Sequence, residues 1–293
     1  MRLDIVLPNE GPSALEVIRS ALAFEEMGYH GLWLTDHVVY HREYPSFYGA
    51  TWLELLASLS HVAALTSRIR LGLGILVVPY RDGVLTAKML ATIDQLSGGR
   101  VDLGIGTGWA EPEFASLGRG DVFARRGAVT NETLEVFELC WRETGPLSFA
   151  GEFHRFADME FEPKPVQRPR IPIWIGSSGV PDPAGSVLRR VARFADVWHP
   201  TGYEGQILTP AELVAGKTVI DALAGRDIPF SVRLHDVGHW PLSQLLDLLG
   251  SYSDAGCIEV AVDLGPMSAG ALRDRAEELI VAARNEDICA KGL

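Results

Sequence analysis

Two adjacent polar residues, Asp36 and His37, follow a short apolar segment and could handle a proton. The segment 31–35 has the composition of a buried strand, so the pair would lie at its carboxyl end. An imidazole titrates near neutral pH, and a neighbouring carboxylate can hold it by a hydrogen bond. We expect His37 to carry a proton or donate a hydrogen bond with Asp36 as its partner. A strand-end turn with a solvated histidine would use the same two residues.

The segment 98–109 predicts a turn, a short buried strand and a loop that ends in one large aromatic residue. Gly104, Gly106 and Gly108 leave little side-chain bulk, so a ligand can approach the backbone closely. The spacing is not the dinucleotide-binding fingerprint, because Trp109 stands where the third glycine belongs. No acidic residue follows at a second strand end about 20 positions later. The loop therefore predicts a small-molecule site of another kind.

A small polar loop, formed by Gly176, Ser177, Ser178 and Gly179, separates a strand-like segment from a helix-like one. Backbone N–H groups and hydroxyls beside a helix N-terminus can bind an anion. We expect this loop to hold a phosphate group, although an ordinary strand-to-helix turn uses the same residue types.

The chain lacks the sequence patterns of several other chemistries. It has no H-E-x-x-H or H-x-H spacing and no C-x-x-C pair, so we expect no metal. It also has no G-x-S-x-G elbow and no Walker motif, which leaves serine-hydrolase and P-loop chemistry unsupported. Three further histidines near predicted strand ends could face the same site: His199, His235 and His239.

Strand-like and helix-like segments alternate along the whole chain and form about eight units. This pattern and the length of 293 residues predict a single α/β domain over residues 1–293, a (β/α)8 TIM barrel. An open, doubly wound sheet is the second choice. Glycines and prolines in the segment 143–171 predict an insertion with little regular structure before the fifth strand. We also expect one continuous strand over 69–78 and a capping box from Thr51 to Glu54.

Composition limits the partners and the compartment. The net charge of −12 argues against nucleic-acid and membrane-surface binding, and no apolar run reaches the ~18 residues of a membrane span. The amino terminus lacks a signal-peptide pattern, and the three cysteines are scattered. We therefore expect a cytoplasmic protein that acts on a small molecule. Apolar positions on its outer helices would allow a homodimer.

Several motifs, taken in order, resemble the bacterial luciferase-like family, and within it the branch of coenzyme F420-dependent oxidoreductases. The resemblance runs from residue 1 to about residue 200 and is strongest in the first half of the chain. It rests on the segments 24–28, 32–38, 69–79, 90–109, 113–114, 172–178 and 195–198.

The resemblance implies a TIM barrel with an insertion that binds a flavin or deazaflavin at the carboxyl ends of its strands. It places Asp36 and His37 beside the tricyclic ring. It also implies a strand bulge with a non-proline cis peptide bond between Gly74 and Ile75, behind the ring. The remaining residues that it implies for cofactor binding are Thr107, Gly108 and Trp109 beside the ring, and Gly176, Ser177, Ser178 and Gly179 at the phosphate.

One departure from this branch concerns its sugar-phosphate dehydrogenases. In those enzymes a glutamate follows the third loop glycine and acts in proton transfer, whereas this chain has Trp109 there. The nearest acidic residues are Glu111 and Glu113. Residues 200–293 match only in general layout, so the resemblance does not identify the substrate.

The resemblance predicts an F420-dependent oxidoreductase in which His37 handles the proton and Trp109 walls the pocket. Lys164, Arg168 and Arg170 of the insertion would meet the anionic glutamate tail of F420. The alternative is an FMN-dependent monooxygenase of the same fold. With either cofactor, a separate F420 or flavin reductase could act as partner. A barrel that binds flavin without turnover is the third hypothesis, and the intact Asp36 and His37 pair argues against it.

Overall fold

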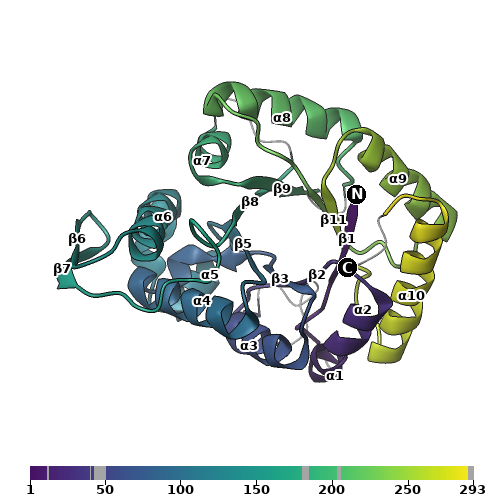
Figure 1. Ribbon diagram of the computed structural model, residues 1–293, viewed down its shortest axis with the longest axis horizontal. Coiled ribbons are helices and arrows are strands. Elements are labelled where there is room, and N and C mark those ends of the chain that lie inside the picture. The colour runs from purple at the N-terminus through teal and green to yellow at the C-terminus, as the bar shows by residue number, and fades with distance from the viewer. Residues whose placement is uncertain (12, 40, 43–50, 180–184, 203–205, 290–293) are drawn as a thin grey trace.

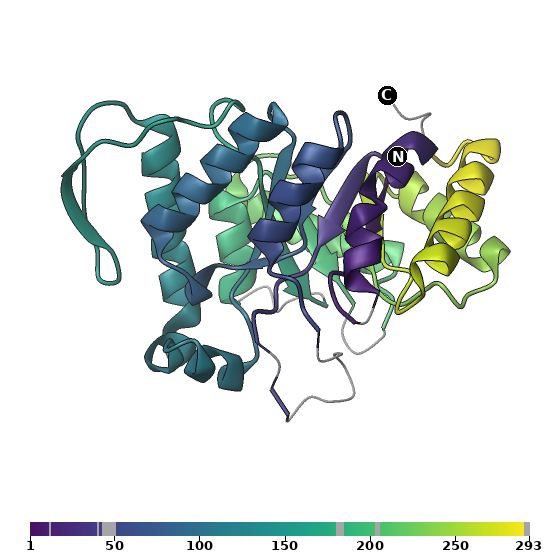
Figure 2. The same ribbon diagram turned by 90° about the horizontal axis from the view of Figure 1, so that it is seen from below.

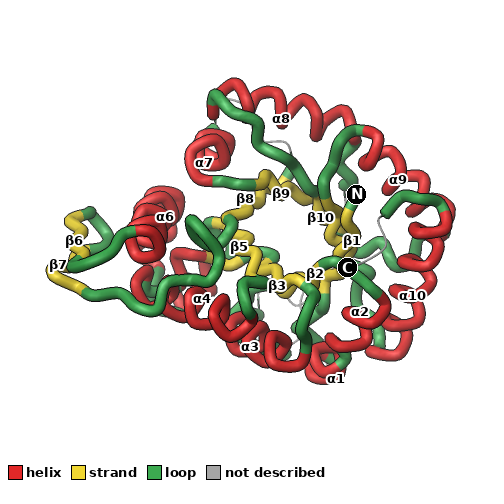
Figure 3. Tube along the Cα trace, viewed as in Figure 1, coloured by secondary structure: helices red, strands yellow, loops and turns green. Residues whose placement is uncertain are grey.

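Eight parallel strand positions close into a ring, and helices cover its outside (Figures 1 and 3). A computed structural model describes residues 1–11, 13–39, 41–42, 51–179, 185–202 and 206–289. Hydrogen-bonded neighbours follow the order β3-β2-β1-β11-β10-β9-β8-β5, and β5 pairs back with β3. The predicted TIM barrel is therefore confirmed, and the open doubly wound sheet is wrong.

The strands are β1 (Arg2–Val6), β2 (Gly31–Leu34), β3 (Arg70–Leu73), β4 (Leu76–Val77), β5 (Val101–Gly106), β6 (Leu147–Ala150), β7 (Arg155–Met159), β8 (Ile173–Ser178), β9 (Val197–Thr201), β10 (Val232–Leu234) and β11 (Glu259–Val262). The α-helices are α1 (Ala14–Arg19), α2 (Ala21–Met27), α3 (Leu55–Leu65), α4 (Gly83–Ser97), α5 (Glu111–Ser116), α6 (Arg126–Arg142), α7 (Ser186–Phe194), α8 (Pro210–Ala224), α9 (Leu242–Asp254) and α10 (Ala269–Asn285). Two 3-10 helices are η1 (Val78–Tyr80) and η2 (Gly120–Arg125).

Two tryptophans fill the barrel interior, and glycines on neighbouring strands make room for them. Trp33 and Trp174 pack edge to face with ring centroids 5.1 Å apart. A Cβ atom on Gly72 would lie 2.2 Å from Cδ2 of Trp33. One on Gly104 would lie 2.0 Å from the Leu73 carbonyl oxygen and 3.1 Å from Cζ3 of Trp33, so Gly104 accommodates the neighbouring strand and the barrel core. The prediction that a ligand can approach the backbone at this glycine is therefore wrong for Gly104.

The third strand position is divided into β3 and β4, so the prediction of one continuous strand over 69–78 is wrong. Gly74 and Ile75 separate the two pieces, and the peptide bond between them is cis, as the resemblance implied. β3 pairs with β2 and β5, whereas β4 pairs with β5 alone among the described strands. The interruption places the backbone of Gly74 and Ile75 at the carboxyl end of the barrel.

The insertion lies between β5 and β8, which is before the fifth strand as predicted, but it contains regular structure. β6 and β7 form an antiparallel hairpin that stands away from the ring (Figures 1 and 2). Phe149 and Phe156 stack across it with centroids 6.0 Å apart. The glycines and prolines therefore predicted the turns of the insertion correctly. They did not predict its two short strands.

Helix ends show which local predictions hold. A capping box of Thr209 and Glu212 is present at the start of α8. The capping box predicted from Thr51 to Glu54 is wrong, because Glu54 is itself the N-cap of α3 and accepts a hydrogen bond from the Ala57 amide. None of the described helices is long and apolar enough to cross a bilayer.

Candidate active site

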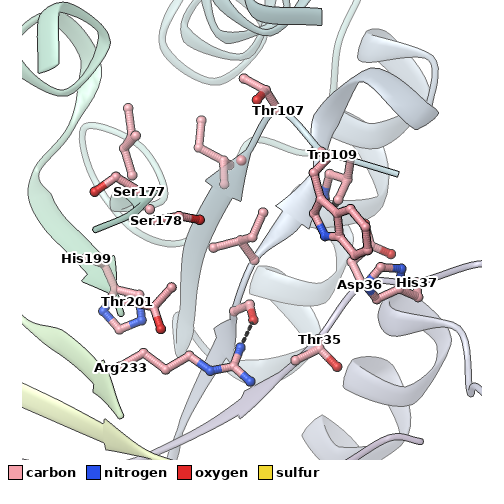
Figure 4. Close-up of a pocket in the computed structure, with 18 of the residues that line it drawn as sticks. Thr35, Asp36, His37, Thr107, Trp109, Ser177, Ser178, His199, Thr201 and Arg233 are labelled. Atoms are coloured by element: carbon pink, nitrogen blue, oxygen red, sulfur yellow. Dashed lines mark hydrogen bonds between the residues drawn. The ribbon is translucent and has the colours of Figure 1, made fainter. Parts of the chain in front are cut away.

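A cavity of about 530 Å³ opens at the carboxyl ends of the barrel strands. The two sides of this cavity face each other in Figure 4, with Trp109 and His37 on one and Ser177 and His199 on the other. Of the residues that the resemblance implies beside the ring and at the phosphate, all except Gly179 line it. The lining is Glu10, Thr35, Asp36, His37, Trp52, Gly74, Ile75, Val77, Tyr80, Ile105, Gly106, Thr107, Gly108, Trp109, Ile175, Gly176, Ser177, Ser178, Val187, Arg190, His199, Thr201, Arg233 and His235.

His37 pairs with a buried carboxylate that the sequence did not single out. Its Nδ1 lies 2.8 Å from Oε2 of Glu113, a residue of α5 that is 1% exposed. The same oxygen accepts the Tyr80 hydroxyl at 2.8 Å, and Oε1 accepts the Val38 amide at 2.6 Å. Burial alone would raise the pKa of Glu113, but these hydrogen bonds, led by that of His37, hold it below its ordinary value. Glu113 is therefore an ionised acceptor.

Asp36 does not partner His37, so that expectation is wrong. Successive residues at a strand end point to opposite sides, which sends the two side chains apart. Asp36 accepts two hydrogen bonds from the Arg81 guanidinium, at 2.6 and 2.8 Å. It also accepts the Val77 amide at 2.8 Å. Asp36 therefore fixes the backbone of β4, which follows Gly74 and Ile75.

Two tryptophans flank His37 at the mouth of the cavity. The imidazole centroid lies 4.8 Å from that of Trp52 and 6.1 Å from that of Trp109. Trp109 is 50% exposed, so its indole forms a wall that a ligand would cover. This agrees with the place predicted for Trp109 beside the pocket.

The floor of the cavity is flat because glycines face one isoleucine. A Cβ atom on Gly106 would lie 2.1 Å from Cδ1 of Ile75, and one on Gly176 would lie 3.2 Å from its Cγ2. Gly108 has a φ of +76°, which favours glycine, and its carbonyl accepts the Arg126 Nε at 3.0 Å. Gly106 and Gly176 therefore make room for the Ile75 side chain, which forms this part of the cavity lining.

Arg233 of β10 reaches across the barrel to the interrupted strand. Its guanidinium donates to the Gly74 carbonyl (dashed line in Figure 4) and to Oδ2 of Asp263 at 2.9 Å. His235 Nδ1 also lies 2.8 Å from that oxygen. Burial would raise the pKa of Asp263, but His235 and Arg233 lower it well below the ordinary range. This wall therefore combines one carboxylate with two basic side chains.

Glu10 is a further lining residue that sequence reasoning missed. It follows β1, and its carboxyl group is affected by the charges of Asp263, Arg233, His37 and His235. Burial, and then the charge of Asp263, raise its pKa above the ordinary value. In the sequence, a single glutamate that follows a strand and lines a cavity looks the same as a glutamate that is exposed to solvent.

His199 lines the cavity but is unsuited to carry a proton. It is buried against Trp33, with ring centroids 4.7 Å apart and an angle of 13° between the planes. Burial, followed by the charge of Arg233, lowers its pKa to about 3. Its Nδ1 lies 2.7 Å from the Ser231 hydroxyl. His199 is therefore neutral at physiological pH. His235 also lines the cavity, whereas His239 does not.

The residues predicted to form a phosphate loop lie on the wall opposite His37. The prediction of a loop is wrong for Gly176, Ser177 and Ser178, because they form the end of β8, and only Gly179 follows the strand. Ser177 and Ser178 face the cavity, and Arg190 of α7 also lines it. The Ser177 hydroxyl donates to the Gly179 carbonyl at 3.2 Å, and it accepts the Trp198 indole N–H at 3.2 Å. Arg190 is buried and donates to the Asn131 side chain at 2.6 Å. This wall can offer hydroxyls and one cation to an anionic group.

The insertion does not supply the cations expected to meet a cofactor tail, so that expectation is wrong. Lys164 donates to the Cys140 carbonyl at 2.9 Å, and Arg168 donates to the Pro165 carbonyl. Arg170 pairs with Glu138 and Asp196. These contacts lie near the end of α6 and just before β8 and β9. They are therefore at the amino-terminal ends of the barrel strands, away from the cavity. None of the three residues lines the cavity.

Comparison with known proteins assigns the family. The family model described as luciferase-like monooxygenase matches residues 1–232. The chain belongs to the luciferase-like monooxygenase family. Its members are oxidoreductases, and this luciferase-like chain is an enzyme of that class.

Two sequence relatives and one solved structure are similar to this luciferase-like chain. An uncharacterized protein of Mycobacterium tuberculosis is 34% identical over 218 residues, covering 74% of this chain and 71% of that protein. An FMNH(2)-dependent dimethylsulfone monooxygenase of Pseudomonas putida is 35% identical over 136 residues, covering 45% and 36%. The solved structure of an F420-dependent secondary alcohol dehydrogenase with an F420-acetone adduct has a TM-score of 0.78 and 15% identity. It covers 97% of this chain and 99% of that one.

Proposed function

We propose that the protein is an F420-dependent oxidoreductase that transfers a hydride between the deazaflavin and a small organic substrate. The observation that carries the proposal is the His37–Glu113 pair beside a flat, glycine-lined floor. This arrangement offers a planar binding surface and a proton at one place. Among the described lining residues there is no cysteine and no lysine to act as a covalent nucleophile.

The described residues fit a tricyclic cofactor. Its ring would lie on the floor formed by Ile75, Gly106 and Gly176, where a larger residue at either glycine would push the Ile75 side chain out of its place. Its phosphate would meet the hydroxyls of Ser177 and Ser178. When bound, F420 supplies or accepts the hydride, and the protein provides orientation and the proton.

His37 would exchange a proton with the substrate oxygen while the hydride is transferred at the adjacent carbon. Because ionised Glu113 can only accept, Nδ1 of His37 carries a hydrogen and Nε2 is the atom that exchanges the proton. Tyr80 donates to the same carboxylate oxygen, which fixes Glu113 from a second side. Trp109 would exclude water from the mouth of the cavity.

The charge of the phosphate wall supports F420 over FMN. F420 carries a phosphodiester with a single negative charge, whereas FMN ends in a phosphate monoester that approaches two. Of the two arginines among the described residues that line the cavity, Arg233 already pairs with Asp263, and Arg190 already donates to Asn131. A monoanion is therefore matched better than a dianion at this wall. The F420-dependent dehydrogenase with the same fold supports the same choice.

An FMN-dependent monooxygenase is the second candidate, because the Pseudomonas putida relative is named for reduced FMN. In that case His37 would stabilise an oxygen-derived species, and a separate flavin reductase would supply reduced cofactor. For F420, an F420 reductase would serve in the same way.

A paired titration separates the two candidates. We would titrate the purified protein with F420 and with FMN under identical conditions and follow cofactor fluorescence. The proposal expects F420 to bind at least ~10-fold more tightly than FMN. Tight FMN binding without F420 binding would overturn it in favour of the monooxygenase. As a control for the phosphate wall, Arg190→Met should weaken F420 binding, whereas Arg189→Met on the same helix should not.

A further inference from the structure

A second cluster of polar side chains lies inside the barrel at the end opposite the cavity. Asp4 belongs to β1, His30 precedes β2, and Glu259 begins β11. These three strands are neighbours in the order β2-β1-β11. Asp4 and Glu259 are each 1% exposed, and the His30 side chain is 18% exposed. The cluster therefore joins the first strand of the barrel to the last one.

The donor atoms of this cluster are spaced like the ligands of one small cation. His30 Nδ1 lies 3.2 Å from Oδ1 of Asp4 and 3.3 Å from Oε2 of Glu259. All three donor atoms lie within 4.8 Å of one another. Tetrahedral Zn²⁺ with bonds of about 2.0–2.2 Å places its ligand atoms roughly 3.3 Å apart. One imidazole and two carboxylates are also suitable ligand types for such a cation.

Glu259 gives an independent indication of a missing ligand. Neither of its carboxylate oxygens accepts a hydrogen bond of good geometry from a residue that the structure describes, although both are buried and His30 Nδ1 lies 3.3 Å from Oε2. Arg2 Nε lies 3.0 Å from Oε2 on the solvent side, and its side chain is 43% exposed. A buried carboxylate without hydrogen bonds is costly unless a cation or a proton compensates it.

The surroundings suit a dication. Two carboxylates and a neutral imidazole around a dication sum to zero charge, and Arg2 can then turn to solvent. The adjacent Arg70 and Asp102 neutralise each other. Trp33 Nε1 donates to Oδ2 of Asp4 at 2.6 Å, which orients the carboxylate and leaves Oδ1 toward His30.

We propose that Asp4, His30 and Glu259 bind a divalent transition-metal cation, with Zn²⁺ the best match, and that this ion fastens β1 to β2 and β11. Water would complete the coordination from the side of His30, the most exposed of the three. The expectation of no metal rested on motifs within short segments. Here Asp4 and His30 are 26 residues apart and Glu259 lies near the other end of the chain, so no such motif can form.

The test uses Zn²⁺ on the full chain after removal of metals with a chelator. Calorimetry should show one Zn²⁺ per chain. At a hundredfold excess over the measured Kd, the melting temperature should rise by about 5 °C. His30→Gln should weaken binding at least ~100-fold. His61→Gln, at an exposed histidine of α3, should bind Zn²⁺ like the unchanged protein.

Co²⁺ gives a second readout that needs no variant. Substitution of Co²⁺ into the unchanged protein should produce the intense visible absorption of a four-coordinate site, and Zn²⁺ should abolish it. The proposal is overturned if Zn²⁺ does not bind one to one, or if it binds His30→Gln and the unchanged protein equally. It is also overturned if the melting temperature changes with pH but not on addition of any cation. That result would show that protonation, without a metal ion, stabilises the cluster. Neither readout requires F420 or FMN.

Discussion

The Nδ1 atom of His37 lies 2.8 Å from the Oε2 atom of Glu113, and this contact joins the loop after β2 to helix α5. Glu113 is almost completely buried, whereas His37 faces the cavity. The carboxylate therefore holds the imidazole in one tautomer at the place where a substrate would react. The two residues should act as one unit in catalysis.

This unit can be tested by a double-mutant cycle. His37→Ala should lower turnover by ~10²-fold or more, because the proton donor is lost. Glu113→Gln should lower turnover by roughly 10-fold, because the orienting charge is lost. The double variant should be no slower than His37→Ala alone. Steady-state rates with a substrate found by screening would measure this. Strictly multiplicative losses, or an unchanged rate in His37→Ala, would remove the pair from the mechanism.

The flat floor predicts the effect of adding one methyl group. In Gly106→Ala the new Cβ would meet Cδ1 of Ile75, which would then move into the space for the cofactor ring. We expect cofactor affinity to fall by at least ~10-fold, with a loss of stability near 1 kcal/mol. Fluorescence titration and thermal melting would measure the two effects.

Gly250→Ala is the matched control for this substitution. Gly250 lies within α9, and no atom lies within 4 Å of a Cβ built there. Alanine should stabilise the protein by about 0.5–1 kcal/mol and leave cofactor affinity unchanged. Equal cofactor affinity in the Gly106 and Gly250 variants would contradict a ring site on this floor.

Glu10 should destabilise the folded protein at neutral pH. Its folded-state pKa is raised by burial and by Asp263, so its ionisation opposes folding as pH rises above the ordinary value of 4.5. Glu10→Gln cannot ionise and should melt roughly 1–2 °C higher at pH 7, with no gain at pH 4. Melting curves across this range would measure the difference. A lower melting temperature at pH 7 would contradict the burial of an uncompensated carboxyl group.

Glu25 should show the opposite dependence on pH. Its carboxylate accepts the backbone amides of Ser67, Arg68 and Ile69 before β3. Burial opposes its ionisation, but these hydrogen bonds outweigh that effect and lower its pKa from 4.5 to about 2.

A group with a lowered folded-state pKa stabilises the protein fully above pH 4.5 and loses that effect as pH falls toward 2. Glu25→Gln should therefore cost about 2 kcal/mol at pH 7, and the difference from the unchanged protein should shrink below pH 4.5. Urea unfolding at pH 7, 5 and 4 would measure this. A difference that stays constant from pH 7 to pH 3.5 would show that lost packing causes the effect.

Sequence reasoning predicted the barrel because buried strands and amphipathic helices each leave a local pattern. The capping box at Thr209 and Glu212 likewise depends on residues close in the chain. The cis bond between Gly74 and Ile75 came from the family resemblance, since the apolar run on both sides of it predicts a single strand. The break depends on contacts with distant residues, among them the bonds from Arg233 to Gly74 and from Val77 to Asp36.

The sequence predicted many of the residues that line the cavity, but it did not predict which of them form hydrogen-bonded pairs. Asp36 and His37 are neighbours in sequence, which suggested a pair, yet their side chains diverge and each binds a residue far along the chain. Glu113 lies 76 residues from His37 on a helix of six residues, too short for a periodic pattern. Glu10 and Arg233 are single polar residues at strand ends, and only the closed barrel brings them to the same cavity.

The edge contact between Trp109 and His37 gives the enzyme an internal optical probe. The indole is half exposed, and its centroid lies 6.1 Å from that of the imidazole. Indole emission depends on what lies against the ring, so the emission lost in Trp109→Phe reports on this mouth of the cavity. The arrival of a ligand against the exposed indole can then be followed in real time without any added label.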